Sequence, residues 1–286
     1  MSTTDDNTLP RRAALALAAV AAAACRPKRV LHLDHVLVKR AAGALPLKDP
    51  GAEAWADAPE HEATLSAQRV APPMLQEPGI PKVRVRGLHD GTWLALRLEW
   101  DDRSKSALYG PSIFPDAAAV QFPRGEGAAP SVMMGHPGGP VRILYWKAAW
   151  QTDDMLTALH PNRPPTHYPY EVATGEHRAT MEREYAPARF VHNPNVERPN
   201  NAPVLLAEAE MFGSLTALPD GRTDGKGVHE NGRWRVVLAT TLEMLQGSAR
   251  PGRDGSVAFA VWDGAGKNAG ARKMRSDNWA RLVVEA

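Results

Sequence analysis

The strongest constraint on the fold is a series of short segments in which apolar and polar residues alternate, with no long amphipathic helix between them. Over 82–100, apolar residues occupy alternate positions on both sides of a turn at 89–91, as in a β-hairpin with one buried face. Similar runs, each bounded by Gly, Pro, Asn or Asp, lie at 117–122, 141–147, 204–209, 234–242, 257–262 and 280–284. Consecutive strands favour antiparallel sheets packed face to face. We therefore predict a mainly β chain, an antiparallel β-sandwich with a few short helices and long loops.

Helical patterns are weak. The segments 148–159 and 176–185 are each long enough for a few turns, and 241–246 for about one. The region 161–203 is rich in Pro, Asn and His and forms a long excursion that a sandwich does not need. Insertions of this kind usually carry function or contact a partner.

Composition limits the classes of partner and of site. The chain has 286 residues, which suits one large β domain, and its formal net charge is +2 without a long charged block. This balance argues against nucleic-acid binding and against a polybasic membrane tether. Cys25 is the single cysteine, so the chain alone builds neither a disulfide nor a cysteine-ligated metal site. Any metal must be held by other residues.

The first 25 residues have the pattern of an export signal. Arg11 and Arg12 precede an uncharged apolar run over 13–24, a partial twin-arginine match that also suits an ordinary secretory signal. We expect residues 1–25 to be this signal, residues 26–286 to form a single domain, and the protein to be periplasmic. Cys25 follows three alanines and is a candidate lipid anchor, although the Leu expected three residues earlier is missing.

Motifs for self-contained catalysis are missing from the sequence: there is no nucleophile elbow, phosphate-binding glycine loop, zinc-protease helix or paired cysteine motif. The closest pair of histidines, His32 and His35, would point to opposite faces of a strand, which favours surface positions over metal ligation. The histidines of the 161–203 excursion and its flank are scattered. We interpret them as loop residues.

Two segments stand out. One is 133–140 (MMGHPGGP), in which Met133 and Met134 stand in a tight Gly/Pro turn ahead of an aromatic strand. The other is 262–279, a glycine-rich loop with several basic residues between two strands. Methionines often fill irregular gaps in a core, and loop lysines are usually solvated, so spacing alone leaves both segments with ordinary explanations.

These two segments, together with 202–218 and with 225–228 followed by 232–234, resemble the haem-binding subunit family of ethylbenzene dehydrogenase. That family includes the gamma subunits of dimethylsulfide dehydrogenase, chlorate reductase and selenate reductase. The likeness runs from about Leu45 to the C-terminus, and the four motifs occur in the family's order.

The resemblance implies a β-sandwich holding one haem b between a methionine and a lysine. The methionine of the Met-Gly turn falls on Met134 and the lysine of the 262–279 loop on Lys273. Met133, His136 and Lys267 are the alternatives to these two ligands. Without a Cys-x-x-Cys-His sequence the haem would be bound non-covalently.

Other residues are candidates for haem contact. Trp146, Tyr145, Phe122 and Trp262 would pack against the porphyrin or fill the sandwich core. An arginine would pair with the propionates, and the candidates are Arg142, Arg272 and Arg275.

With both axial positions filled, such a haem transfers electrons and does not turn over substrate. The resemblance implies a non-catalytic subunit that relays electrons between the iron–sulfur beta subunit of a molybdopterin enzyme, whose alpha subunit holds the molybdopterin, and a carrier such as a soluble cytochrome c. The alternative is a haem-free sandwich that binds carbohydrate or serves as a scaffold.

Overall fold

The computed structural model describes residues 32–108, 112–125, 127–151, 202–218 and 222–286, and His32–Ala286 make up one compact unit. The export signal expected at 1–25, the helix expected at 176–185 and nearly all of the 161–203 excursion lie outside the described residues. In the part of the chain that is described, no helix is long and apolar enough to cross a membrane.

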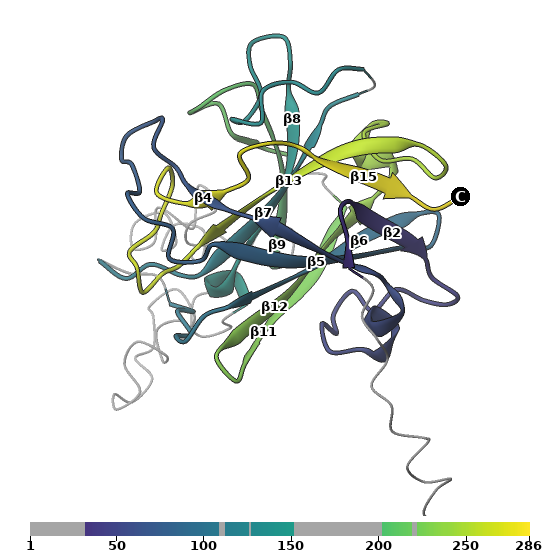
Figure 1. The fold of residues 1–286 in the computed structure, drawn as a ribbon, viewed down its shortest axis with the longest axis horizontal. Coiled ribbons are helices and arrows are strands. Elements are labelled where there is room, and N and C mark those ends of the chain that lie inside the picture. Colours follow the sequence, from purple (N-terminus) through teal and green to yellow (C-terminus); the bar gives the residue numbers. More distant parts are fainter. Residues whose placement is uncertain (1–31, 109–111, 126, 152–201, 219–221) are drawn as a thin grey trace, which may run out of the picture. The chain divides into compact units, whose positions relative to one another are not determined.

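The fold is mainly β, as predicted, and the described residues form a 15-stranded sheet with short 3-10 turns (Figure 1). The strands are β1 His32–Leu33, β2 Val36–Arg40, β3 Glu60–Thr64, β4 Ser66–Ala67, β5 Lys82–His89, β6 Trp93–Asp101, β7 Ala117–Pro123, β8 Val141–Lys147, β9 Val204–Ala209, β10 Thr216–Ala217, β11 Thr223–Glu230, β12 Arg233–Thr241, β13 Asp254–Trp262, β14 Met274–Arg275 and β15 Ala280–Val284. The 3-10 turns are η1 Glu53–Asp57, η2 Ala148–Gln151 and η5 Glu243–Leu245.

The hydrogen-bonded order is β10-β9-β8-β7-β13-β15-β2-β5-β6-β12-β11, and this continuous sheet folds back on itself into two layers. Strands β11 and β12 at one end of the order contact β8 and β9 near the other end across the interior. Strand β13 belongs to both layers: residues 254–257 pair with β15, and residues 258–262 pair with β7. The chain is therefore a sandwich whose two layers share one strand.

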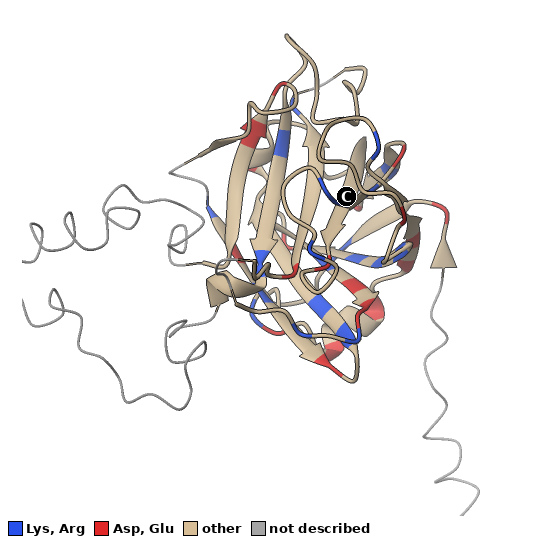
Figure 2. Cartoon of the chain, turned by 90° about the vertical axis from the view of Figure 1, so that its left-hand side faces the viewer, with Lys and Arg blue, Asp and Glu red and all other residues tan. Residues whose placement is uncertain are grey.

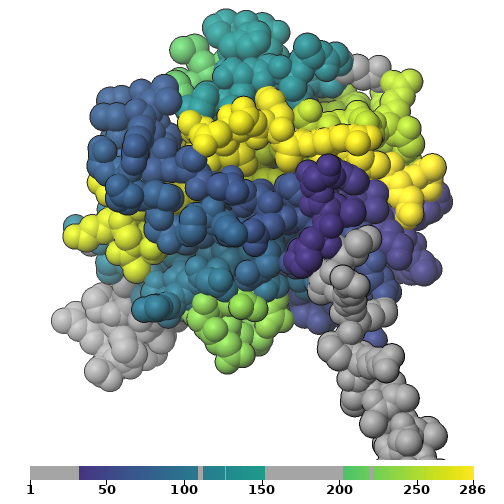
Figure 3. Space-filling view, viewed as in Figure 1, coloured from purple at the N-terminus to yellow at the C-terminus, as the bar shows by residue number. Residues whose placement is uncertain are grey.

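The sandwich is predominantly antiparallel, with three parallel pairs, β1 with β3, β15 with β2, and β2 with β5. Two of these pairs place β2 between the C-terminal strand and β5. Figure 3 shows the yellow C-terminal segment lying against the purple segment that contains β2. The two ends of the described chain are thus joined within one layer.

The space between the layers is filled by the residues that the alternation placed on buried faces. Three tryptophans, Trp100, Trp146 and Trp234, lie at its centre, with ring centroids 5.0–6.4 Å apart. Gly227 of β11 lies directly over Trp146, and a Cβ at this position would overlap the indole ring. The core therefore requires a residue without a side chain on this edge strand.

Charged residues of both signs are interspersed over the strands and loops and do not gather into one block (Figure 2). The outer face of the layer containing β5, β6 and β12 carries a small apolar cluster around Trp55 of η1. The outer face of the other layer is different, because a cavity lies on it.

The predicted strands are all present, and the hairpin over 82–100 turns where expected. Of the weak helical predictions, 148–159 is a 3-10 turn over its first four residues, with the remainder outside the described residues, and 241–246 is the single turn η5. His32 is exposed and lies near Glu60, and His35 lies beside the exposed Asp34. These positions agree with the surface location that the sequence favoured. Strands β2, β3 and β11 were not predicted, nor were the two-residue strands β1, β4, β10 and β14.

Candidate functional site

A cavity of about 460 Å³ lies on the outer face of β7, β8 and β13. Residues in a strand point alternately to opposite faces, so the odd-numbered residues of β7 and β8 and the even-numbered residues of β13 face this cavity. A cavity of this size is within the range of cofactor sites in proteins, about 300–1,000 Å³. Its lining is mainly apolar.

The floor of the cavity is set by strand register. Ala260, Ala119 and Tyr145 lie side by side across the three strands, and the neighbouring row is Ala258, Gln121 and Ile143. Small side chains in the central positions leave room above the sheet. The aromatic side chains stand at the edge of this space, with the Tyr145 and Trp262 rings 5.1 Å apart and tilted by 59°. The result is a flat, apolar floor with an aromatic wall.

Loops from distant parts of the chain form the rim, and buried polar groups hold them in place. Gln121 donates from Nε2 to the carbonyl of Val132 at 3.0 Å, which ties the methionine turn to the floor. Trp262 donates from Nε1 to the carbonyl of Gly270 at 3.0 Å, which ties down the glycine-rich loop. Gln68 donates to the carbonyl of Ala271 at 3.0 Å and brings a third segment to the rim. These bonds fix the positions of the loops that carry the predicted ligands.

Met134 and Lys273 meet in this cavity although they are 139 residues apart in the chain. The Sδ atom of Met134 lies 3.8 Å from the Nζ atom of Lys273. Met134 has a φ of 67°, a left-handed conformation that a residue with a side chain rarely adopts. Such conformations cost about 1–3 kcal/mol and concentrate at functional sites.

The Lys273 amine is tuned toward its neutral form. Burial, with a further contribution from Arg275, lowers the pKa of Lys273 to about 8. The Nζ atom also lies 5.2 Å from the centre of the Trp262 ring. A lysine binds a metal only as the neutral amine, so this environment reduces the cost of deprotonation on binding. A soft thioether and an amine whose deprotonation is made easier by burial face one another in an apolar cavity, and this pair suits the iron of a haem.

A second lysine lines the cavity. Lys147 ends β8, its Nζ atom lies 5.0 Å from the Trp150 ring centre and 5.3 Å from the Tyr145 ring centre, and burial lowers its pKa to about 8. The sequence interpretation did not single out this residue. Odd-numbered residues of β8 point to one face of the sheet. The placement of Lys147 on the same face as Tyr145 could therefore have been inferred from the sequence.

The alternative ligands are placed differently. Met133 lines the cavity beside Met134. His136 is exposed, does not line the cavity and points its Nδ1 to the carbonyl of Pro137 at 3.0 Å. Lys267 is exposed in the turn that follows β13 and does not line the cavity either. The structure therefore brings Met134, Met133 and Lys273 together, and leaves His136 and Lys267 outside.

The aromatic and arginine candidates divide according to the face of their strand. Tyr145 and Trp262 line the cavity. Trp146 and Phe122 face the interior between the layers. Arg142, an even-numbered residue of β8, lies outside the cavity, where its Nε is 3.0 Å from Glu208. Sequence placed Trp146 and Arg142 in the cofactor site, whereas their strand phase turns them away from this cavity.

Of the other arginines, Arg275 lines the cavity and Arg272 does not. Arg275 donates from Nη1 to Asp277 at 2.9 Å. The remaining lining residues that sequence did not single out come from four rim segments and from the floor strands; they are Gln68, Ala71, Pro72, Val132, Phe212, Gly213, Leu215, Gly270, Ala271, Ser276, Gln121, Ile143, Ala119, Ala258, Phe259 and Ala260. Strands generally favour β-branched residues, so the run of three alanines at 117–119 was a signal in the sequence for an open cavity floor.

The solved structures that align with the chain do so with low TM-scores. A protein of Bacteroides uniformis described as carbohydrate-binding is 10% identical, aligns with 90% of this chain and 100% of its own, and has a TM-score of 0.46. A similarity of this extent carries no argument about ligands.

Sequence relatives are more informative. A protein of Haloferax mediterranei whose name assigns it as a respiratory nitrate reductase heme subunit is 24% identical over 234 residues, which are 80% of this chain and 66% of that protein, just under two thirds of its length. The chlorate reductase subunit gamma of Ideonella dechloratans is 22% identical over 274 residues, 94% of this chain and 93% of that protein. The family model described as ethylbenzene dehydrogenase matches residues 52–274, well over half of the sequence. The chain therefore belongs to the ethylbenzene dehydrogenase family.

Proposed function

We propose that this chain is a non-catalytic electron-transfer subunit that binds one haem b, with Met134 and Lys273 as the axial ligands. The observation that carries the proposal is the 3.8 Å approach of the Met134 sulfur to the Lys273 nitrogen inside an apolar cavity. The names of the two relatives, a heme subunit and a reductase gamma subunit, support the same function.

The side chains divide the work. Met134 would supply a soft sulfur ligand, which favours ferrous iron and raises the reduction potential, and Lys273 would supply an amine ligand. Ala119 and Ala260 leave the floor open for a planar group, while Tyr145 and Trp262 exclude water from its side. Arg275 is positioned at the lining to pair with a propionate. A bound haem would supply a one-electron carrier, and two filled axial positions would leave no open site for substrate.

The proposed partners are those of a multi-subunit reductase or dehydrogenase. We assign an iron–sulfur beta subunit and a molybdopterin alpha subunit to the complex, and a soluble cytochrome c to the external side. The location proposed for the protein is the periplasm, reached by the twin-arginine-like signal at 1–25, with Cys25 as a candidate anchor.

The proposal is tested by absorption spectroscopy of the protein produced in an exporting host with haem supplied, oxidised and then reduced with dithionite. Met134→Ala and Lys273→Ala should each lose the low-spin spectrum with its sharp reduced α band, because each removes one axial ligand. The matched controls Met133→Ala, Lys267→Ala and Lys147→Ala should keep it. Circular dichroism of every variant checks that the sandwich has formed.

A folded protein without a Soret band after haem reconstitution would refute the haem proposal and leave the haem-free binding or scaffold function. A low-spin spectrum that survives Lys273→Ala but is lost in Lys147→Ala would move the nitrogen ligand to β8. Survival in Met134→Ala with loss in Met133→Ala would move the sulfur ligand by one residue.

A further inference from the structure

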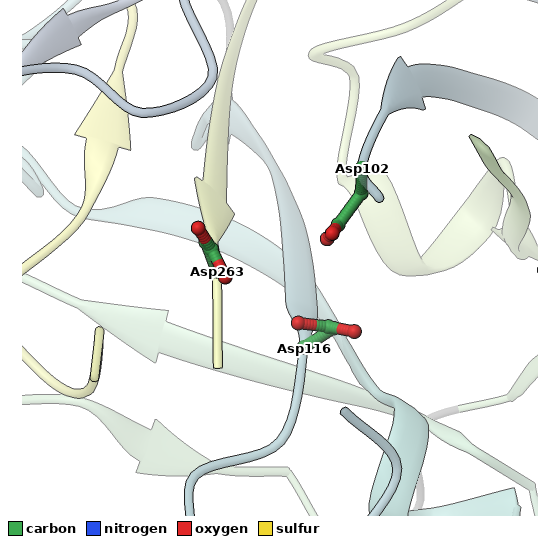
Figure 4. A group of neighbouring side chains, drawn as sticks. All are labelled: Asp102, Asp116 and Asp263. Atoms are coloured by element: carbon green, nitrogen blue, oxygen red, sulfur yellow. The ribbon is translucent and has the colours of Figure 1, made fainter. Parts of the chain in front are cut away.

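Three aspartates meet at a place where no function has been assigned. Asp102 follows β6, Asp116 precedes β7 and Asp263 follows β13, so three separate strand ends bring their carboxylates together. One oxygen from each lies within 4.8 Å of the other two. Figure 4 shows the three side chains pointing toward a common centre. Asp102 and Asp116 are buried and Asp263 is partly buried.

The hydrogen bonds around the cluster do not satisfy it. Asp116 accepts bonds on both oxygens, from the Gly264 and Ser106 amides and from Trp234 Nε1 at 2.9 Å. Asp102 accepts bonds from Ser104 on Oδ1 only. Its Oδ2 is buried and has no hydrogen-bond partner in the described structure, and the residue as a whole is 8% exposed. A buried carboxylate oxygen without a partner is costly, and the Asp102 carboxylate that carries it points toward the other two (Figure 4).

The cluster also places negative charge in a buried position. Asp102 and Asp116 are 8% and 0% exposed, and burying a carboxylate without a compensating charge is costly. A cation between the three carboxylates would offset this cost.

We propose that Asp102, Asp116 and Asp263 bind a calcium ion. Carboxylate oxygens are ligands for hard cations, and the set contains no histidine or cysteine that would favour zinc or copper. Calcium accepts irregular arrangements of oxygens with water completing the shell, whereas magnesium demands a near-ideal octahedron. The three carboxylates come from three strand ends, and one of them is held by backbone amides. Such an irregular set of oxygens fits calcium better than magnesium.

The position of the cluster suggests what the ion does. Asp263 begins the glycine-rich loop that ends at Lys273, and Asp116 lies where β7 enters the cavity floor. Asp102 comes from the opposite layer. An ion held by all three would join the two layers and fix the start of the loop that carries the lysine, independently of whether haem is bound.

The experiment uses the full chain after removal of metals with a chelator. Terbium, a luminescent substitute for calcium, should show emission sensitised by Trp234, which donates to Asp116 at 2.9 Å, and calcium should displace it. The Tm should rise with calcium, by about 3–6 °C for each tenfold excess over the Kd. Asp102→Asn should abolish both responses, while Glu53→Gln, which removes an exposed carboxylate of η1, should leave them intact.

A second comparison separates ion binding from a structural role. Without metal, Asp102→Asn should be as stable as the native chain or more so, because it removes one buried charge and its amide can donate to the neighbouring carboxylates. With calcium the order should reverse. Asp263→Asn should behave in the same way and serves if the first variant does not fold.

The proposal is overturned if neither emission nor Tm responds to calcium up to about 10 mM, above the weakest range of calcium modules. It is also overturned if the Asp102→Asn chain responds like the native one. Equal competition by magnesium would overturn the assignment to calcium.

Discussion

At the scale of single residues, the most informative positions are those held in unfavourable states. Met134 adopts a left-handed backbone conformation, and Lys273 has an amine whose burial disfavours its charge. Both residues lower stability in the absence of a ligand, and each offers an atom to the same cavity. Positions that break local rules are expected where a site has been built.

Lys273 gives the haem-free chain a specific pH dependence. Its pKa falls from 10.5 to about 8 on folding, so between these pH values the unfolded chain holds one proton more than the folded chain. Stability therefore rises with pH across this window, by up to about 3 kcal/mol for this group. Lys147 has the same shift and adds to the slope.

Urea denaturation of the haem-free chain at several pH values from 7 to 10.5 measures the effect. Lys273→Met should be more stable than the native chain at pH 7 and should lose about half of the slope, and Lys147→Met should do the same. A slope unchanged in both variants would show that neither amine is desolvated as described.

The ligand pair was reached from sequence only through family resemblance. Spacing does not distinguish Lys273 from Lys267, six residues earlier in the same loop, because both stand among glycines and other polar residues. The two lysines differ in the folded structure. Lys267 is exposed in a turn, while the backbone carbonyl of Lys273 accepts a hydrogen bond from the backbone amide of Gln68, which anchors the chain there.

At the scale of elements, strand phase decides which residues contribute to the site. Ala119 faces the cavity, and its neighbour Ala118 faces the core between the layers. Ala119→Leu should fill part of the floor and weaken haem binding with little effect on folding. Ala118→Leu should overpack the core and cost about 1–3 kcal/mol.

Haem titration followed by absorbance, and urea denaturation, applied to both variants, separate the two effects. If Ala119→Leu bound haem like the native chain, the floor assigned to β7 would be incorrect.

Gly227 gives a second prediction at this scale. A methyl group there would overlap the indole of Trp146, so Gly227→Ala should displace the ring or the edge strand and destabilise the chain by about 1–3 kcal/mol. Tryptophan fluorescence during thermal unfolding reports both the environment and the Tm. Gly43→Ala, which meets no atom within 4 Å, is the control and should change neither.

Two of the strands that sequence did not reveal, β3 and β11, share a physical cause. Strand β3 contains Glu60 and His61, which are buried because Glu60 pairs with Arg86 at 3.1 Å and His61 bonds the carbonyl of Leu33. Strand β11 contains two glycines, one of them required by Trp146. In both, tertiary contacts override the weak local preference for a strand, and no alternation of apolar residues remains to be read.

At the scale of the whole molecule, the proposed export signal at 1–25 leads to a prediction of its own. We expect replacement of Arg11 and Arg12 by lysine to prevent export, because a twin-arginine signal depends on both guanidinium groups. Cell fractionation with immunoblotting measures the distribution. Efficient export of the double variant would indicate an ordinary secretory signal instead.

Strand β13, shared by both layers, has a consequence for kinetics. The cavity lies on the outer face of one layer, so separating the layers would not widen it, and the shared backbone of β13 opposes that separation in any case. A cofactor would therefore enter and leave through movement of the rim loops around Gln68, Met134 and Lys273. Retention time and thermal stability are then separate properties, and two variants that unfold at the same temperature can differ widely in how long they hold what they bind.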